Sequence, residues 1–97
     1  MTLNVPFLVR PEIETSPKEV VTIQEGDSLY LQCNILAGSP IPSIRWTRCG
    51  KELLTENQMY SIKSIKKSEA GCYSCEADNG FSSSPASKEV TVIVQCK

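Results

Sequence analysis

The stretch Glu69-Ala70-Gly71-Cys72-Tyr73-Ser74-Cys75-Glu76-Ala77, residues 69–77, decides the fold of this chain. Its first residues, up to Gly71, end a turn that begins at Lys66. After this turn Tyr73, Cys75 and Ala77 alternate with the residues between them, so their side chains share one face of an extended segment. The stretch therefore predicts a β-strand with one face directed into a core.

Short alternating segments of the same kind recur between turn signals along the whole chain, which is an all-β pattern. The expected strands are 20–23, 28–33, 44–47, 52–54, 59–65 and 90–94, beside the one after Gly71. Segment 38–42 is a loop, because its two prolines cannot sit in a central strand. Segment 78–87 is a second loop, rich in Gly, Ser and Pro. No window shows a helical period and no internal repeat is visible, so we predict a single unit of about seven strands.

The composition fits one ordinary globular domain. The chain has 97 residues, 40% hydrophobic and 22% charged, with a net charge of −1. This balance gives no electrostatic footprint for nucleic acid, and no run approaches the ~20 apolar residues of a membrane span. We expect neither a nucleic-acid partner nor direct membrane contact by this segment. Residues 1–10 are interpreted as an added start or an interdomain linker, and residues 11–97 as the domain.

Catalytic chemistry finds no support in the residue types present. The chain contains no histidine, which removes Ser-His-Asp and Cys-His catalysis and every histidine metal site. No nucleophile–base pair is apparent, and Glu52, Glu56 and Glu69 are interpreted as surface carboxylates. We therefore expect no enzyme, no cofactor and no metal site.

Four residues on the expected strands form a more specific pattern. Cys33, Trp46, Tyr73 and Cys75 follow the order Cys…Trp…Tyr-x-Cys. This order resembles the immunoglobulin superfamily, in which two cysteines bridge the sheets and a tryptophan packs against the bridge. The resemblance implies an immunoglobulin-like two-sheet sandwich.

Three further motifs extend the resemblance over about residues 11–95. They are similar to the I-set: Gly38-x-Pro40-x-Pro42-x-x-x-Trp46, Ile65-x-x-x-Glu69-Ala70-Gly71-x-Tyr73-x-Cys75, and Glu25-Gly26-Asp27-Ser28-Leu29. The eight residues 73–80 are also similar to Fc-receptor-like and related leukocyte receptors.

Two departures from the I-set pattern change the expected edges of the sandwich. Only fourteen positions separate Trp46 from Tyr60, where the family usually fits two edge strands. We therefore expect one short strand around 52–54 and a short or absent strand D. In the turn before Tyr73, Glu69 replaces the family's aspartate, and no arginine lies near Met59 to make the salt bridge that is usual in the family.

Five cysteines in a small loop-rich chain point to an oxidising compartment. The resemblance implies a Cys33–Cys75 bridge between the sheets. Two packed free thiols are the alternative, and they would suit a cytosolic relative. Cys72-Tyr73-Ser74-Cys75 also has the Cys-x-x-Cys form, but it lies inside a strand with its cysteines on opposite faces. A redox motif would instead start a helix, and a four-cysteine zinc site would need a second such pair.

A second bridge follows from counting outward along two strands. Counting from Trp46 and from Cys75 places Cys49 and Cys72 on the same outer face of neighbouring antiparallel strands. If Trp46 lies opposite Cys75, the residue numbers of both pairs add up to 121, so Cys49 and Cys72 are directly opposed. Opposed residues of this kind lie about 4.5–5.5 Å apart, within the range that a disulfide accepts. Cys96 is left over, either free, or paired between domains or chains, or paired otherwise if the register slips.

By the same resemblance the chain is an extracellular protein-binding or adhesion module of a cell-surface receptor. The implied partners are a protein ligand or a homophilic contact, and neighbouring immunoglobulin domains of the parent chain. The candidate contact residues lie on the outer face of the sheet that contains the strand of Cys75, or in the loop before the last strand. They are Arg45, Thr47, Glu76, Ile93 and Phe81. A spacer domain in a multi-domain stalk and a cytosolic I-set scaffold domain remain open as alternatives.

Overall fold

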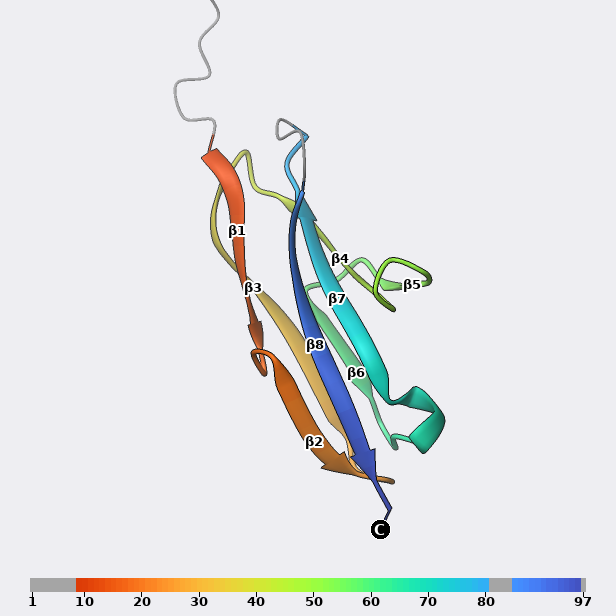
Figure 1. Cartoon of the computed structure of the whole chain (residues 1–97). Helices are drawn as coiled ribbons and strands as arrows, with labels where there is room; N and C mark the ends of the chain where they lie inside the picture. Colours follow the sequence, from red (N-terminus) through yellow and green to blue (C-terminus); the bar gives the residue numbers. More distant parts are fainter. Residues whose placement is uncertain (1–8, 81–84, 97) are drawn as a thin grey trace, which may run out of the picture.

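The computed structural model describes residues 9–80 and 85–96, which fold into two β-sheets packed face to face (Figure 1). The strands are β1 (Val9–Ser16), β2 (Val20–Gln24), β3 (Leu29–Ser39), β4 (Ser43–Thr47), β5 (Leu53–Thr55), β6 (Met59–Ile62), β7 (Gly71–Asp78) and β8 (Ala86–Gln95). A short 3-10 helix, η1 (Lys67–Glu69), precedes β7. Within these residues no helix has the length and apolar character needed to cross a membrane.

In the described residues one sheet has the order β1-β3-β6 and the other β2-β8-β7-β4-β5. Neighbouring strands are antiparallel, apart from β2, which runs parallel to β8. The expected all-β, immunoglobulin-like sandwich is therefore confirmed.

The eighth strand is β1, which the sequence pattern did not reveal. Its buried positions are Pro11, Ile13 and Thr15, so only Ile13 gives the strong apolar signal on which a strand prediction rests. The cost of burying Thr15 is offset because its hydroxyl donates a hydrogen bond to the Lys18 carbonyl at 2.7 Å. The strand begins at Val9, two residues before the expected start of the domain.

The expected loss of strand D is also seen. In the described chain β5 is followed by residues 56–58, which form no strand, and then directly by β6. As a result β6 is the last strand of the smaller sheet, and among the strands of residues 9–80 and 85–96 it pairs with β3 alone.

Trp46 occupies the centre of the core with no exposed surface, and its indole nitrogen donates to the Gln58 carbonyl at 2.9 Å. The side chains packed around it are buried as expected: Leu31, Cys33, Ile62, Tyr73 and Cys75. Because Tyr73, Cys75 and Ala77 all lie on the inner face of β7, the alternation read from residues 69–77 describes this strand correctly.

Gly38, near the end of β3, is a position that requires glycine. Its φ is +146°, in a region that favours glycine. A Cβ atom there would lie 2.7 Å from Cγ and 2.9 Å from Cδ of the buried Pro42 ring. Glycine thus lets β3 turn tightly into β4 over the top of the core.

Candidate functional site

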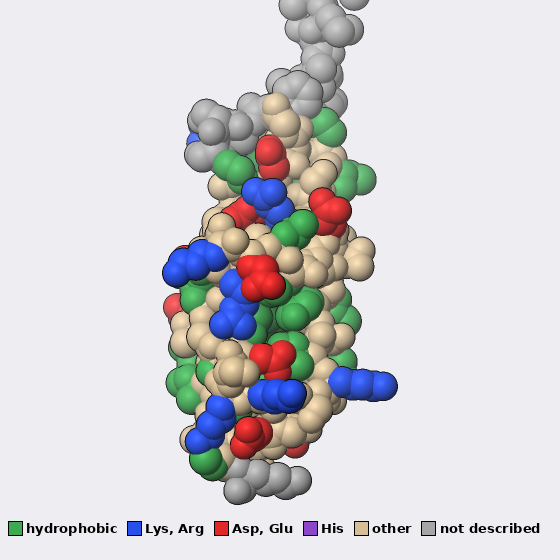
Figure 2. Space-filling view, turned by 90° about the vertical axis from the view of Figure 1, so that its right-hand side faces the viewer, with side chains coloured by type: hydrophobic (Ala, Val, Ile, Leu, Met, Phe, Trp, Pro, Cys, Tyr) green, Lys and Arg blue, Asp and Glu red, His purple; other side chains and the backbone are tan. Residues whose placement is uncertain are grey.

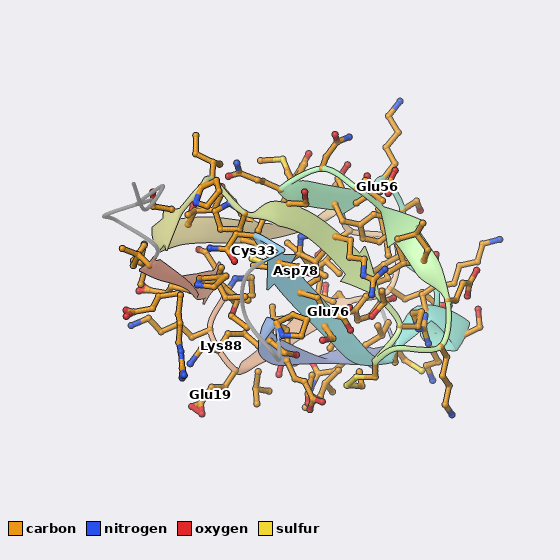
Figure 3. All side chains as sticks on the ribbon, turned by 90° about the horizontal axis from the view of Figure 1, so that it is seen from above. Glu19, Cys33, Glu56, Glu76, Asp78 and Lys88 are labelled. Carbon is orange, nitrogen blue, oxygen red and sulfur yellow. A yellow bond between two sulfur atoms is a disulfide. The ribbon has the colours of Figure 1, made fainter. Side chains whose placement is uncertain are left out.

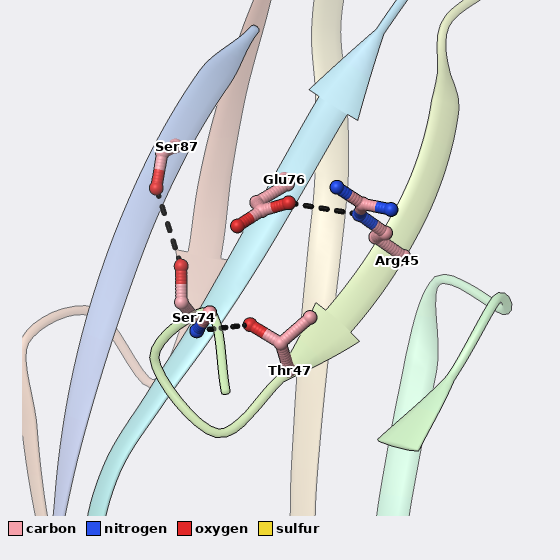
Figure 4. A network of polar contacts seen from close by, with 6 residues as sticks. Arg45, Thr47, Ser74, Glu76 and Ser87 are labelled. Atoms are coloured by element: carbon pink, nitrogen blue, oxygen red, sulfur yellow. Dashed lines mark hydrogen bonds and ion pairs between the residues drawn. The ribbon is translucent and has the colours of Figure 1, made fainter. Parts of the chain in front are cut away.

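Two of the candidate contact residues meet on the outer face of the larger sheet. Arg45 on β4 lies opposite Glu76 on β7, and its Nε donates to Glu76 Oε1 at 2.8 Å (Figure 4). The Arg45 side chain is 58% exposed and that of Glu76 is 23% exposed. The pair therefore presents charged groups at the surface in a fixed geometry.

A shallow hollow adjoins this pair. Ser43, Arg45, Glu56, Glu76, Asp78 and Pro85 are among its lining residues. Viewed from above, Glu76 and Asp78 follow one another along β7 (Figure 3). The hollow therefore has three carboxylates around one guanidinium, an environment suited to a cationic or hydrogen-bond-donating group of a partner.

The expectation that Thr47 is a contact residue is wrong. Thr47 is only 6% exposed, and its hydroxyl oxygen accepts a hydrogen bond from the Gly50 amide at 2.8 Å. Opposite it lies Ser74, which is 3% exposed and shares a hydrogen bond with the Ser87 hydroxyl at 3.2 Å (Figure 4). The turn after β4 folds back over Thr47, so this side chain holds the turn in place and is itself covered.

Ile93 does not join the Arg45–Glu76 pair. It is 43% exposed on β8, but Glu76 lies opposite Ser87, six residues away along that strand. At roughly 3.3 Å per residue, Ile93 lies about 20 Å from the pair. Phe81 lies outside the described residues. The structure thus brings together Arg45 and Glu76 out of the five candidates.

The bridge between Cys33 and Cys75 joins the two sheets through the core. Its Cα atoms are 6.4 Å apart, and both residues have no exposed surface. Trp46 lies opposite Cys75 between β4 and β7, which is the register assumed when Cys49 was predicted to lie opposite Cys72. In Figure 3 Cys33 lies between the layers of the sandwich.

Cys49 is bonded to Cys72 on the outer side of the larger sheet, with Cα atoms 5.6 Å apart. The route differs from the expected one, because β4 ends at Thr47 and Cys49 lies in a turn with a φ of 50°. The Arg48 amide donates to the Glu52 carbonyl at 2.9 Å and holds this turn closed. Cys49 therefore meets Cys72 from a turn instead of from a strand partner.

A carboxylate oxygen of Glu89 lies within 4.8 Å of the Cys49 and Cys72 sulfurs. These are three groups of the kind that bind metals, but two sulfurs bonded to each other offer no thiolate to an ion. The cluster is therefore a disulfide with a neighbouring surface carboxylate.

Cys96 is the cysteine that remains free, and it is exposed just after β8. The Lys67 side chain forms a hydrogen bond with it. That bond, followed by the charge of the Cys96 group, raises the pKa of the exposed Lys67 ammonium. The end of β8, which this residue follows, lies at the opposite end of the sandwich from the start of β1 (Figure 1).

Arg48 is a residue whose role the sequence analysis missed. Its guanidinium donates to the Tyr73 hydroxyl at 3.0 Å and to the Ala70 carbonyl at 3.2 Å, and lies 4.7 Å from the centre of the Tyr73 ring. The Tyr73 hydroxyl in turn donates to the Glu69 carbonyl. Burial raises the pKa of Tyr73, while the charge of Arg48 opposes this effect.

This arrangement replaces the salt bridge that is usual in the family at the turn before Tyr73. The Glu69 carboxylate accepts from the Lys66 amide at 2.9 Å, whereas Arg48 reaches the phenol and the backbone. Strand alternation counted from the buried Trp46 would direct Arg48 to the inner side of the sheet, and an arginine that faces a core needs partners. That conflict was the signal that could have identified this role of Arg48.

Charges of both signs are mixed over the face shown in Figure 2, with hydrophobic side chains between them. Such mixing is typical of protein surfaces, so this face does not by itself single out a binding site.

Comparisons with known proteins place the chain among immunoglobulin domains. The family described as "Immunoglobulin domain" matches residues 10–79. MAM domain-containing glycosylphosphatidylinositol anchor protein 1 of Homo sapiens is 38% identical over 85 residues, covering 80% of this chain and 9% of that protein. IgLON family member 5 of Homo sapiens is 34% identical over 74 residues, covering 76% of this chain and 22% of that protein.

Among solved structures, that of Dpr2 Ig1-Ig2 in complex with DIP-Theta Ig1-Ig3 matches with a TM-score of 0.78 and 32% identity. The match covers 90% of this chain and 32% of the other. The chain thus spans about a tenth to a third of the length of these similar proteins.

Proposed function

Because the chain belongs to the immunoglobulin domain family, we propose that it is an extracellular protein-binding or adhesion module of a larger cell-surface or secreted protein. The names of its relatives support this proposal, since one refers to a glycosylphosphatidylinositol anchor. The similar solved structure is a complex between two proteins with immunoglobulin domains. We assign the chain no catalytic step.

The Arg45–Glu76 pair carries the proposal. Arg45 bonds Glu76 through Nε, while the two terminal nitrogens of its guanidinium have no partner among the described residues (Figure 4). Arginine is enriched at protein interfaces, and its planar group binds carboxylates and carbonyl groups in two-point contacts. Glu76 holds the guanidinium in place beforehand, which lowers the entropy cost of binding.

The neighbouring hollow adds a second contact. Glu56 and Asp78 lie beside the pair, so a partner that brings one carboxylate to Arg45 and one basic group to the hollow would match both. We propose this outer part of β4 and β7 as the binding surface.

The disulfides and the chain path are consistent with an extracellular multi-domain protein. Two bridges use four of the five cysteines, which suits an oxidising compartment. The described chain starts at one end of the sandwich and leaves at the other (Figure 1). This arrangement suits domains joined in series. Reduced thiols in the native protein would instead favour the cytosolic scaffold.

The test uses the chain displayed as a multimer against a panel of cell-surface and secreted ectodomains that includes the chain itself. Arg45→Glu places two carboxylates opposite each other and should weaken any specific binding at least tenfold. Lys18→Glu is the matched control, because it also reverses one exposed charge but lies between β1 and β2. Binding that Arg45→Glu leaves unchanged would contradict the proposed surface, and no binding across the panel would favour the spacer function.

A further inference from the structure

The absence of strand D leaves the backbone of β6 open on one side. The Cys33 amide donates to the Gln58 carbonyl at 2.8 Å, which fixes how the ladder between β3 and β6 alternates. Gln58, Tyr60 and Ile62 direct their backbone groups toward β3, so Met59 and Ser61 direct theirs away from it. In the described part of the chain no strand or loop pairs with these outward groups.

This edge lacks the features that usually protect an edge strand. Met59-Tyr60-Ser61-Ile62 has no charge and no proline, and Met59 is 49% exposed. By contrast β1 carries a proline and three charged residues, and β5 has three residues between two glutamates. Both of those edges resist pairing with another strand.

The edge strand β2 is also uncharged, but its flanks oppose pairing with itself. In the fully overlapped antiparallel register Thr22 lies opposite its own symmetry mate, and Glu19 lies opposite Glu25 of the second copy. Two like-charged pairs then face each other, one at each end, and such pairs are destabilising. The β6 edge has no corresponding conflict.

We propose that two copies of this chain pair antiparallel along β6 about a two-fold axis and form one continuous six-stranded sheet. The two inner faces coincide only if opposed residues lie on the same side of the sheet. Tyr60 then lies opposite its own symmetry mate, and Met59 lies opposite Ser61 of the second copy. Since Met59 and Ser61 are the residues with free backbone groups, this register forms four main-chain hydrogen bonds between the copies.

The side chains fit the same register. Tyr30, 61% exposed, lies opposite Ser61 within one copy, so Met59 of the second copy comes next in the same row on the outer face. Dimerisation therefore covers two exposed apolar side chains of each copy. At the flanks Asn57 lies opposite Lys63 of the second copy, with Glu56 beside that lysine, so the nearest charges have opposite signs.

Sedimentation velocity over roughly 1 μM to 1 mM tests the dimer in the Cys96→Ser chain, which excludes a covalent link through that thiol. The double variant Met59→Lys/Ser61→Lys sets lysine against lysine twice and should raise the dimer Kd more than tenfold. The matched control Val20→Lys/Thr22→Lys adds two lysines to the exposed side of the β2 edge and should leave the Kd unchanged.

Hydrogen exchange of the Cys96→Ser chain tests the register without altering the edge. The amides of Met59 and Ser61 should exchange at least tenfold more slowly at high concentration, while those of Tyr60 and Ile62, which already bond β3, should change little. A chain that stays monomeric, a dimer that the β6 lysines leave intact, or unchanged Met59 and Ser61 exchange in a dimer would each overturn the inference. It does not rest on the proposed binding surface, since Arg45→Glu should leave dimerisation unchanged.

Discussion

The two disulfides share strand β7 but lie in different surroundings. Cys75 points inward and bonds Cys33 across the core, and neither cysteine has any exposed surface. Cys72, three residues earlier, points outward and bonds Cys49 in a partly exposed turn. The inner bridge adds to packing that Trp46 already organises, whereas the outer bridge fixes a surface turn that is otherwise held mainly by hydrogen bonds. Identical bonds on one strand therefore stabilise the fold in different ways.

The largest effect is expected from removing the packing around the inner bridge. Trp46→Ala should lower the free energy of unfolding by about 3–5 kcal/mol, because it empties the centre of the core and removes the bond to the Gln58 carbonyl. Urea denaturation followed by circular dichroism measures this loss. A variant with wild-type stability would show that Trp46 does not organise the packing around the inner bridge.

Removing the inner bridge itself should cost an amount in the middle of that range. The Cys33→Ala/Cys75→Ala variant opens a loop with a sequence separation of 42, which corresponds to about 4 kcal/mol in the loop-entropy relation. The free energy of unfolding from urea titration provides the value. If this variant were as stable as the wild type, the reduced core would have to pack as well as the oxidised one.

The outer bridge should matter less, and its loss should leave the domain folded. Cys49→Ser/Cys72→Ser opens a separation of 23, which corresponds to about 3 kcal/mol, while the inner bridge stays in place. Non-reducing peptide mapping of the wild type should first recover Cys49 linked to Cys72. A melting temperature that does not fall in the variant, or a map that links Cys49 to Cys96, would remove the distinction between the bridges.

The smallest effect concerns Tyr73, which lies between the two bridges on β7. Burial raises its pKa above the ordinary value of about 10, so the folded state favours the protonated phenol. This contribution to stability is complete below about pH 10 and is lost as the pH rises through the raised pKa. Tyr73→Phe should therefore flatten the stability profile above pH 10, and the exposed Tyr30→Phe should not. Urea titrations from pH 7 to 11 give both profiles, and equal profiles would contradict the assignment.

The inner half of the comparison could be predicted from sequence because alternation in a strand has a fixed period. The strand after Gly71 and the core follow from that period, and the structure confirms them. The structure also shows Trp46 opposite Cys75, the register that was assumed for the second bridge. The absence of strand D was predictable as well, because the segment between Trp46 and Tyr60 is too short to hold two edge strands.

The outer half could not be predicted in the same way, because it depends on a turn. Alternation continued past Thr47 predicts the correct partner for Cys49, but it predicts a strand where the chain forms a turn. It also predicts an exposed Thr47, whereas the turn covers this residue. Arg48 belongs to the same turn, and its bonds to Tyr73 and Ala70 depend on a contact between distant segments. Local periodicity carries no information about such contacts.

The nesting of the two bridges on β7 has a mechanical consequence. When a tandem array is stretched, force enters through both ends of the domain and is carried across the link between Cys33 and Cys75. The chain between these residues, with its separation of 42, cannot extend while this link is intact, and Cys49–Cys72 lies wholly inside it. The outer bridge bears no load until the inner one is reduced. Cleaving it alone should leave the extended length of the domain unchanged, whereas cleaving the inner one would release about 60–80 Å of chain before the outer bridge tightens.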